Sequence, residues 1–160
     1  MNIIVNATPL ISLAVINHLH LLEQIFEKAY IPHAVYNEVI AQGKNKAGYT
    51  QLLQMKDFIV VEPINTALKQ SIMLQLDEGE AEVITIAKDM NMPLVCIDEF
   101  AGRKYANLLG LEVVGTLGIL LIAKKRGFIP IIKPLCDQLI QHDRYISREL
   151  YNSILNKANE

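Results

Sequence analysis

The chain has 160 residues, of which 51% are hydrophobic and 20% are charged, and its formal net charge at pH 7 is -2. This composition excludes an intrinsically disordered chain, and the charge excludes a general electrostatic attraction to nucleic acid, so any such binding must use local basic patches. At this length we expect one domain, residues 1–160, that buries roughly 70% of the surface of the unfolded chain.

Cysteine usage and hydropathy indicate a cytoplasmic protein with no membrane partner. The chain has two cysteines, Cys96 and Cys136, and neither a CxxC pair nor a Cys/His pattern with zinc-ligand spacing. Met1 to Val5 lacks the basic residues and the cleavage site of a signal peptide. The apolar run Gly118 to Ala123 is too short to span a bilayer.

The first half of the chain alternates short apolar strands with helices. A strand at 3–5 ends at Asn6, and Thr8 followed by Pro9 predicts the N-cap and first turn of a helix that continues from Leu10 to Ile16. The other elements expected in this half are strands at 29–31 and 58–61 and helices at 19–26, 34–41, around 52–53 and at 67–76.

The stretch from Leu76 to Glu99 organises the chain, because it reads as a helix followed by a buried strand. Asp77 can cap the helix. Glu80 shares one helical face with the apolar residues at 83, 84 and 87. A carboxylate on a core-facing stripe is costly unless it has a partner, so Glu80 requires an explanation that Glu82 does not.

The strand that follows, Leu94 to Ile97, is continuously apolar, as expected of a parallel strand covered on both faces. It stops at Asp98, at the carboxyl end of the sheet, where open α/β sheets bind ligands. The remaining elements expected are a strand at 111–114 and helices at 101–109, 115–126, 130–140 and after Ser147. The alternation predicts an α/β fold in which a central parallel sheet of about four or five strands carries helices on both faces.

Four side chains are expected to meet at the rim of this sheet. Asn6 and Asp98 follow strands, Glu80 begins the helix that leads to the strand of Asp98, and Glu38 comes from its own helix, with Glu99 as a possible accessory. Oxygen ligands without His or Cys suit Mg²⁺ or Mn²⁺ and not zinc. Crowded carboxylates raise one another's pKa unless a cation compensates, and a dication so held supports phosphodiester hydrolysis.

Each of these residues also has a structural interpretation. Asp77 and Glu80 have capping-box spacing, which would make Glu80 a helix cap. Asp98 could cap the helix after it, and Glu99 could be a first-turn acid favoured by the helix dipole. Asn6 fits a plain turn residue, and Glu38 fits a solvated helix acid.

The sequence resembles the PIN-domain nuclease superfamily, specifically a PIN-like subfamily of small prokaryotic proteins often linked to toxin-antitoxin systems. The ending Tyr145-Ile146-Ser147 with Leu150-Tyr151 also looks like that subfamily, so the resemblance extends over nearly the whole chain. The segments that carry it are Val5 to Ile11 (VNATPLI), Ile31 to Val39 (IPxxVxxEV), Gly79 to Glu82 (GEAE), Leu94 to Glu99 (LVCIDE) and Gly115 to Gly118 (GTLG).

The resemblance implies a PIN-like three-layer fold and a metal-dependent ribonuclease site. It implies Glu38, Glu80 and Asp98 as catalytic residues and, with Asn6 and Glu99, as ligands of Mg²⁺ or Mn²⁺, while Thr8 supports the first-strand position. The chain departs from the family at Asn6, where PIN nucleases generally carry aspartate. An amide oxygen can still coordinate Mg²⁺ but brings no charge and cannot act as a base.

Two hypotheses therefore lead. The first is an endoribonuclease acting on single-stranded or structured RNA, with the further hypothesis that it is a toxin held by a small antitoxin protein. The second is a nucleic-acid- or protein-binding module on the same fold that has lost cleavage through Asn6. A phosphate-handling small-molecule enzyme is disfavoured, because the chain has no GxGxxG or GxxxxGK[ST] loop.

Partner surfaces are expected at basic and apolar patches. Lys44, Lys46, Arg103 and Lys104 read as solvated faces, and they are the first places to look for RNA contacts. The apolar excess favours a homo-oligomer, with the last helix, Leu150 to Leu155, as its candidate face.

Overall fold

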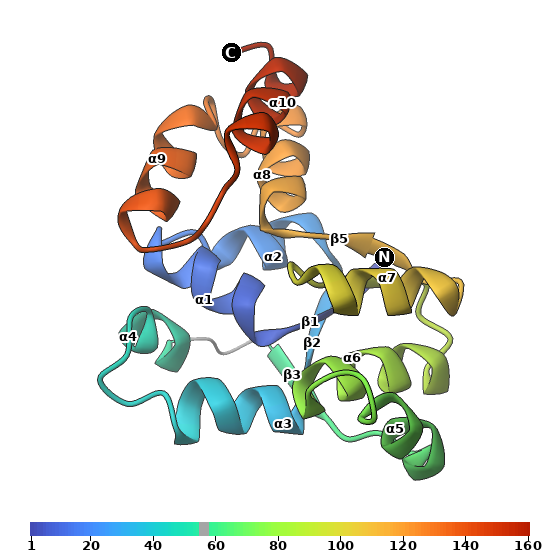
Figure 1. Ribbon diagram of the computed structural model, residues 1–160. Helices are drawn as coiled ribbons and strands as arrows, with labels where there is room; N and C mark the ends of the chain where they lie inside the picture. Colours follow the sequence, from blue (N-terminus) through green and yellow to red (C-terminus); the bar gives the residue numbers. More distant parts are fainter. Residues whose placement is uncertain (55–57) are drawn as a thin grey trace.

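The structure is a computed structural model that describes residues 1–54 and 58–160 (Figure 1). Five parallel strands form one sheet in the order β3-β2-β1-β4-β5. Ile4 of the central strand pairs with Tyr30 on one side and Val95 on the other. The strands are β1 (Asn2–Val5), β2 (Lys28–Pro32), β3 (Phe58–Val61), β4 (Leu94–Cys96) and β5 (Glu112–Val114). The predicted α/β fold with a five-stranded parallel sheet is confirmed.

Strand order reverses between β1 and β4. The chain builds β1, β2 and β3 outward in one direction and then returns to place β4 and β5 on the opposite side of β1. Crevices at such reversal points, outside the carboxyl ends of the strands, are the usual ligand sites of open α/β sheets. The fold therefore places Asn6 and Asp98, the residues beyond the ends of β1 and β4, at this reversal point.

Helices cover both faces of the sheet. Figure 1 shows α1 (Ala7–Val15), α2 (His20–Ile25) and α8 (Thr116–Lys125) on one side of the strands. On the other side α6 (Glu78–Asp89) contacts β1, β2 and β4, with α5 (Thr66–Ile72) packed against it. The other helices are α3 (His33–Tyr36), the π-helical turn η1 (Asn37–Ala41), α4 (Tyr49–Leu53), α7 (Phe100–Leu108), α9 (Lys133–Gln141) and α10 (Arg148–Ala158).

The core consists of the central strands and the helix sides that face them. Ile3, Ile4 and Val5 of β1 are fully buried, as are Val95 and Cys96 of β4, because both faces of these strands are covered. Within the described ranges, no helix combines the length and apolarity needed to cross a membrane.

Two helix starts differ from the prediction by more than one residue. The first helix begins at Ala7 with Asn6 at its N-cap, so the assignment of Thr8 as the cap is wrong. The ninth begins at Lys133 and not at Pro130, because the carboxylate of Glu160 accepts hydrogen bonds from the backbone N–H groups of Ile132, at 2.6 Å, and Lys133, at 2.9 Å. A long-range cap of this kind leaves no local signal in the sequence.

The last helix packs largely within the chain. Ser147 caps it as predicted, accepting a hydrogen bond from the N–H of Leu150 at 3.1 Å. Ile154 is buried where α10 lies against α8, and the hydroxyl of Tyr151 donates to Asp137 at 2.6 Å. The stripe that we expected to form an oligomer face is therefore mostly used inside the chain, with Leu150 exposed.

Candidate active site

The candidate site forms where the carboxyl ends of the central strands meet the first turn of α6. The N–H of Asn6 donates to the carbonyl of Cys96 at 3.0 Å, which joins the ends of β1 and β4. The N–H of Ile97 likewise donates to the carbonyl of Val114 at 2.9 Å, which joins β4 to β5. Asn6, Asp98 and the residues after β5 are thereby fixed on one rim by the sheet itself.

Asp98 is anchored to the start of α8. Its Oδ1 accepts from the N–H of Thr116 at 2.7 Å and its Oδ2 from the Thr116 hydroxyl at 2.6 Å. Asp98 therefore does not cap the helix that follows it, whose N-cap is Glu99. Burial raises the pKa of Asp98 and the charge of Glu99 raises it further, whereas the Thr116 hydrogen bonds and the Arg103 charge act in the opposite direction.

Glu99 lies at the centre of the acidic group. One of its oxygens accepts a hydrogen bond from the Thr8 hydroxyl, and Oε2 lies 3.4 Å from the amide nitrogen of Asn6. Its side chain thus points back over the rim, toward β1. The interpretation of Glu99 as a first-turn acid missed this contact. The sequence did offer a signal for it, because Glu99 is a second acid after β4 and Thr8 supplies a hydroxyl just after the neighbouring strand β1.

The charge of Glu99 reaches the three other acids of the predicted site. It contributes to the raised pKa values of Glu38, Glu80 and Asp98, although burial is the largest cause for each. We define the acidic rim as Glu38, Asp77, Glu80, Asp98 and Glu99. Since mutual repulsion disfavours ionisation, the rim is electrostatically suited to a cation.

Glu80 has the capping role that the sequence left open. The capping box is present, because the N–H of Glu80 donates to Asp77 Oδ1 at 2.8 Å and the N–H of Asp77 donates to Glu80 Oε2 at 3.3 Å. That bond uses only one carboxylate oxygen. The other, Oε1, is buried and makes no hydrogen bond of standard geometry among the described residues, and the nearest donor is the backbone N–H of Gly102, which lowers the pKa of the carboxyl. A buried oxygen of this kind is costly unless something absent from the bare chain binds it.

A glycine makes room for this oxygen. A Cβ on Gly102 would lie 2.4 Å from Glu80 Oε1, which is closer than atoms can approach without displacement. The first turn of α7 therefore accommodates the Glu80 carboxylate only because position 102 has no side chain. Gly102 is a residue that the sequence analysis did not single out.

Glu38 lies on the outer side of the rim. It is exposed on the π-helical turn, and after burial the charge of Asp77 is the next cause that raises its pKa, followed by the weaker effect of Glu99. The charge of Lys46 lowers this pKa, so the basic loop after η1 lies near the rim. Lys44 of the same loop is exposed.

The sequence interpretation of Glu82 as an acid that needs no explanation is wrong. Glu82 is as buried as Glu80, with 4% of its surface exposed against 5%. It pairs with Lys69 of α5 at 2.6 Å and accepts from the N–H of Ala34 at 2.8 Å. The helix is covered by its neighbours α5 and α3 as well as by the sheet, so Glu82 does require an explanation, and its role is to fix the start of the helical segment that carries Glu38.

The side chains of the rim fit a hard divalent cation by type, but three of them have local partners. Thr116 binds Asp98, Thr8 binds Glu99 and Asp77 binds Glu80. Within residues 1–54 and 58–160, no three His, Cys, Asp or Glu side chains are arranged around one point as ligands of a single ion. The buried Glu80 oxygen without a standard hydrogen bond and the raised pKa values are the observations that fit Mg²⁺ or Mn²⁺.

Arg103 is not a solvated cation. It is half-buried, and its Nη1 donates to the carbonyl of Ile97 at 2.8 Å, next to Asp98. Lys104 is exposed on the same helix. Together with Phe100, Asn107 and Leu108 these residues line a shallow surface hollow of about 450 Å³.

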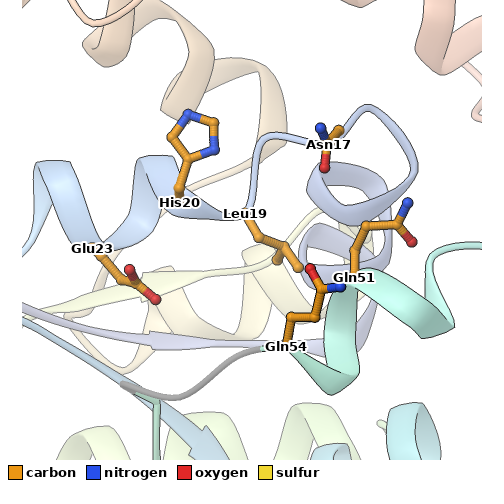
Figure 2. A pocket seen from close by; sticks show the side chains of 6 residues that line it. All are labelled: Asn17, Leu19, His20, Glu23, Gln51 and Gln54. Carbon is orange, nitrogen blue, oxygen red and sulfur yellow. The ribbon is translucent and has the colours of Figure 1, made fainter.

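A polar pocket lies elsewhere, between α2 and α4 (Figure 2). Its volume is about 230 Å³, and it contains none of the predicted site residues. Burial lowers the pKa of His20, and the charge of nearby His18, whose ring centroid is 5.4 Å away, lowers it further. The residues that line the pocket are Asn17, Leu19, His20, Glu23, Gln51 and Gln54.

Comparison with protein families gives one result. The family model described as DUF3368: PIN domain matches residues 2–160. No curated protein and no solved structure matches the chain.

Proposed function

The chain belongs to the PIN-domain family, and on that premise we propose that it is a metal-dependent endoribonuclease that hydrolyses RNA. The observation that carries the proposal is the group of carboxyls at the acidic rim whose pKa values are raised. Burial and neighbouring carboxylates raise the pKa values of Glu38, Glu80 and Asp98 in spite of the nearby Lys46 and Arg103, and one buried oxygen of Glu80 makes no hydrogen bond of standard geometry within the described residues. A divalent cation would relieve both the repulsion and the unmet hydrogen-bonding demand.

The ligands in this proposal are Asn6, Glu38, Glu80, Asp98 and Glu99, all of which bind through oxygen. When bound, Mg²⁺ or Mn²⁺ polarises the phosphoryl oxygen of the substrate and lowers the pKa of a bound water.

The protein itself contributes orientation. Thr116 holds both oxygens of Asp98, and Thr8 holds Glu99, so these carboxylates keep a fixed direction along the rim. Glu38 is exposed, so it is the ligand on the solvent side of the rim.

A second candidate function is an RNA- or protein-binding module without cleavage. Asn6 favours it, because its amide nitrogen faces Glu99 at 3.4 Å and so supplies a neutral donor where a carboxylate would repel. The rim would then tolerate the absence of a cation better than a fully acidic one. A role as the toxin of a toxin-antitoxin pair, in the cytoplasm and inhibited by a small antitoxin protein, extends the first candidate and rests on the family resemblance alone.

Cleavage assays separate the two candidates. Single-stranded RNA would be incubated with the wild-type protein with and without Mn²⁺, in parallel with Asp98→Asn and with Glu23→Gln, an exposed acid remote from the rim. The nuclease proposal predicts metal-dependent cleavage that Asp98→Asn reduces roughly 10²-fold or more and that Glu23→Gln leaves unchanged. RNA binding without cleavage would support the binding module, and cleavage that persists in Asp98→Asn would overturn the site.

A further inference from the structure

A second pocket opens beside the acidic rim. It has a volume of about 250 Å³, and one of its walls is formed by Thr8, Asp98 and Thr116, which belong to the site described above. The opposite wall is the connection between α9 and α10, residues 143–146. A ligand in this pocket would lie against Asp98, yet no step of the proposed reaction uses the connection.

Arg144 is the basic group of this pocket. Its Nε is buried and has no hydrogen-bond partner among the residues that the structure describes. Asp98 and Asp143 also line the pocket, but the guanidinium forms no ion pair with either of them. Arg144 is half-buried, and a guanidinium nitrogen without an acceptor is costly, so Arg144 is the group of this pocket that can bind an anion, against the negative charge of Asp98 and Asp143.

The backbone holds Arg144 in a fixed position. Asp143 has φ +59°, and its N–H donates to the carbonyl of Ile140 at 3.1 Å. The N–H of Arg144 donates to the carbonyl of Leu139 at 2.9 Å. These two bonds form the Schellman motif that ends α9, so the arginine projects from a defined turn and not from a free loop.

Tyr145 adds an aromatic ring at the mouth of the same pocket. It is 91% exposed, which is unusual for a tyrosine that the chain could have packed against the adjacent Ile146 and Leu150. An exposed ring next to an unpaired guanidinium matches the two parts of a nucleotide. Arginine binds phosphate through its planar donors, and aromatic rings stack on bases.

We propose that Arg144 and Tyr145 form a nucleotide subsite, in which Arg144 binds a phosphate of the RNA strand and Tyr145 stacks on the adjacent base. The proposal rests on the proposed function in placing the cleaved bond near Asp98. A base in a single strand or a loop presents its face for such stacking far more readily than a base inside a duplex.

Binding measurements test the subsite independently of cleavage. Fluorescence anisotropy would follow a labelled single-stranded RNA 10-mer and a blunt RNA duplex of the same sequence, without divalent metal and over a range of salt concentrations. The variants are Tyr145→Ala, Tyr145→Phe and Arg144→Ala. Arg148→Ala is the matched control, since Arg148 is exposed at the start of α10, four residues after Arg144, and does not line the pocket.

We expect Tyr145→Ala to weaken single-strand binding about tenfold and Tyr145→Phe to preserve it, because stacking needs only the ring. Arg144→Ala should lower the slope of log K against log salt by about 0.7, the value for one phosphate contact on a single strand. Arg148→Ala should change neither quantity. Duplex binding should be weaker than single-strand binding and insensitive to Tyr145→Ala.

Equal affinities of wild type, Tyr145→Ala and Arg144→Ala for the single-stranded RNA would overturn the subsite. An equal loss of RNA affinity in Tyr145→Ala and Tyr145→Phe would also overturn it, because the phenylalanine ring can still stack. Thermal unfolding of each variant checks that the fold is intact, which the exposure of Tyr145 favours. If the binding losses occur but the wild type cleaves no RNA, the subsite stands and the nuclease proposal fails. If Mn²⁺-dependent cleavage and RNA binding both survive in Tyr145→Ala and Arg144→Ala, the subsite fails and the nuclease stands.

Discussion

The acidic rim and the environment of Glu160 shift the pKa values of their carboxyl groups in opposite directions. At Glu160, Lys124 donates at 2.6 Å and two backbone N–H groups complete the coordination of the carboxylate, so these bonds lower its pKa although burial opposes them. At the rim, burial and neighbouring acids raise the pKa values of Glu80 and Asp98. A carboxylate whose donors are all present holds the fold together, whereas carboxylates that lack a cation are the ones expected to bind something.

The same contrast occurs within two residues of α6. Glu82 has Lys69 and the N–H of Ala34 as partners, whereas Glu80 has no cation beside it and has an oxygen without a standard hydrogen bond among the described residues. Burial alone therefore does not distinguish a structural acid from one proposed to bind a metal. In the proposal above, the distinction is the presence or absence of a positively charged partner.

The largest effect that sharpens this contrast is expected for Glu82→Ala. It leaves the ammonium of Lys69 with only the more exposed Glu78 and removes the acceptor for Ala34, which should cost about 3–5 kcal/mol of unfolding free energy. Urea denaturation measures the loss. A cost below about 1 kcal/mol would show that Glu82 does not fix the start of α3.

Asn6→Asp tests the neutral side chain that lies beside the acidic rim. The added charge should tighten Mn²⁺ binding about tenfold, while in the metal-free protein it removes the donor to Glu99 and lowers the melting temperature. Calorimetry and thermal unfolding measure the two effects separately. Unchanged Mn²⁺ affinity would remove Asn6 from the site.

Gly102→Ala should displace the Glu80 carboxylate without changing any charge. The new Cβ would meet Glu80 Oε1 at 2.4 Å, so the carboxylate must turn away from α7. We expect Mn²⁺ affinity to fall severalfold to about tenfold, the lower range for groups that orient metal ligands. The equivalent change at Gly110, which has nothing within 4 Å of its Cβ position, is the control for metal affinity, because its positive φ would affect stability alone.

The smallest effect expected is a change of a few degrees in melting temperature with Glu80→Gln. Glutamine keeps the capping box and removes the charge. The pKa of Glu80 is raised in the fold above its ordinary value of 4.5. The metal-free wild type should therefore lose stability as the pH rises from this ordinary pKa through the raised pKa of the folded state. Glu80→Gln should therefore be more stable than the wild type at pH 7 and not at pH 4.

Glu160→Gln provides the opposite sign. Its pKa is lowered in the fold, so the wild-type charge stabilises the protein above the ordinary pKa, and this stabilisation disappears as pH falls through the lowered value. The variant should melt below the wild type at pH 7. Equal signs for the two substitutions in thermal unfolding would contradict the distinction between the two regions.

Much of the fold follows from local sequence patterns. The apolar runs at β1 and β4 and the capping box of α6 are signals within a few residues, and each predicts its element correctly. The start of α9 was not predictable in this way, because the cap comes from Glu160, 27 residues away in sequence from Lys133. Long-range caps depend on the packing of α8 and α10 and leave no pattern near the helix that they start.

The sequence indicated which residues form the candidate site better than it indicated which of their side chains contact one another. Strand ends placed Asn6 and Asp98 on one rim, but the central position of Glu99 depends on its side chain turning back toward Thr8, which spacing does not specify. The burial of Glu82 and the room made by Gly102 depend on which helices pack against α6. These relations are tertiary, so a one-dimensional pattern does not contain them.

The most direct test of the account is the anomalous scattering of Mn²⁺ in crystals of the wild-type protein. The account predicts a peak at the acidic rim, coordinated by Asp98 and Glu99 and reached by the Oε1 of Glu80. Loss of that peak in Asp98→Asn crystals would complete the agreement. Well-ordered crystals with no Mn²⁺ at the rim, or with Mn²⁺ only at carboxylates elsewhere, would contradict it.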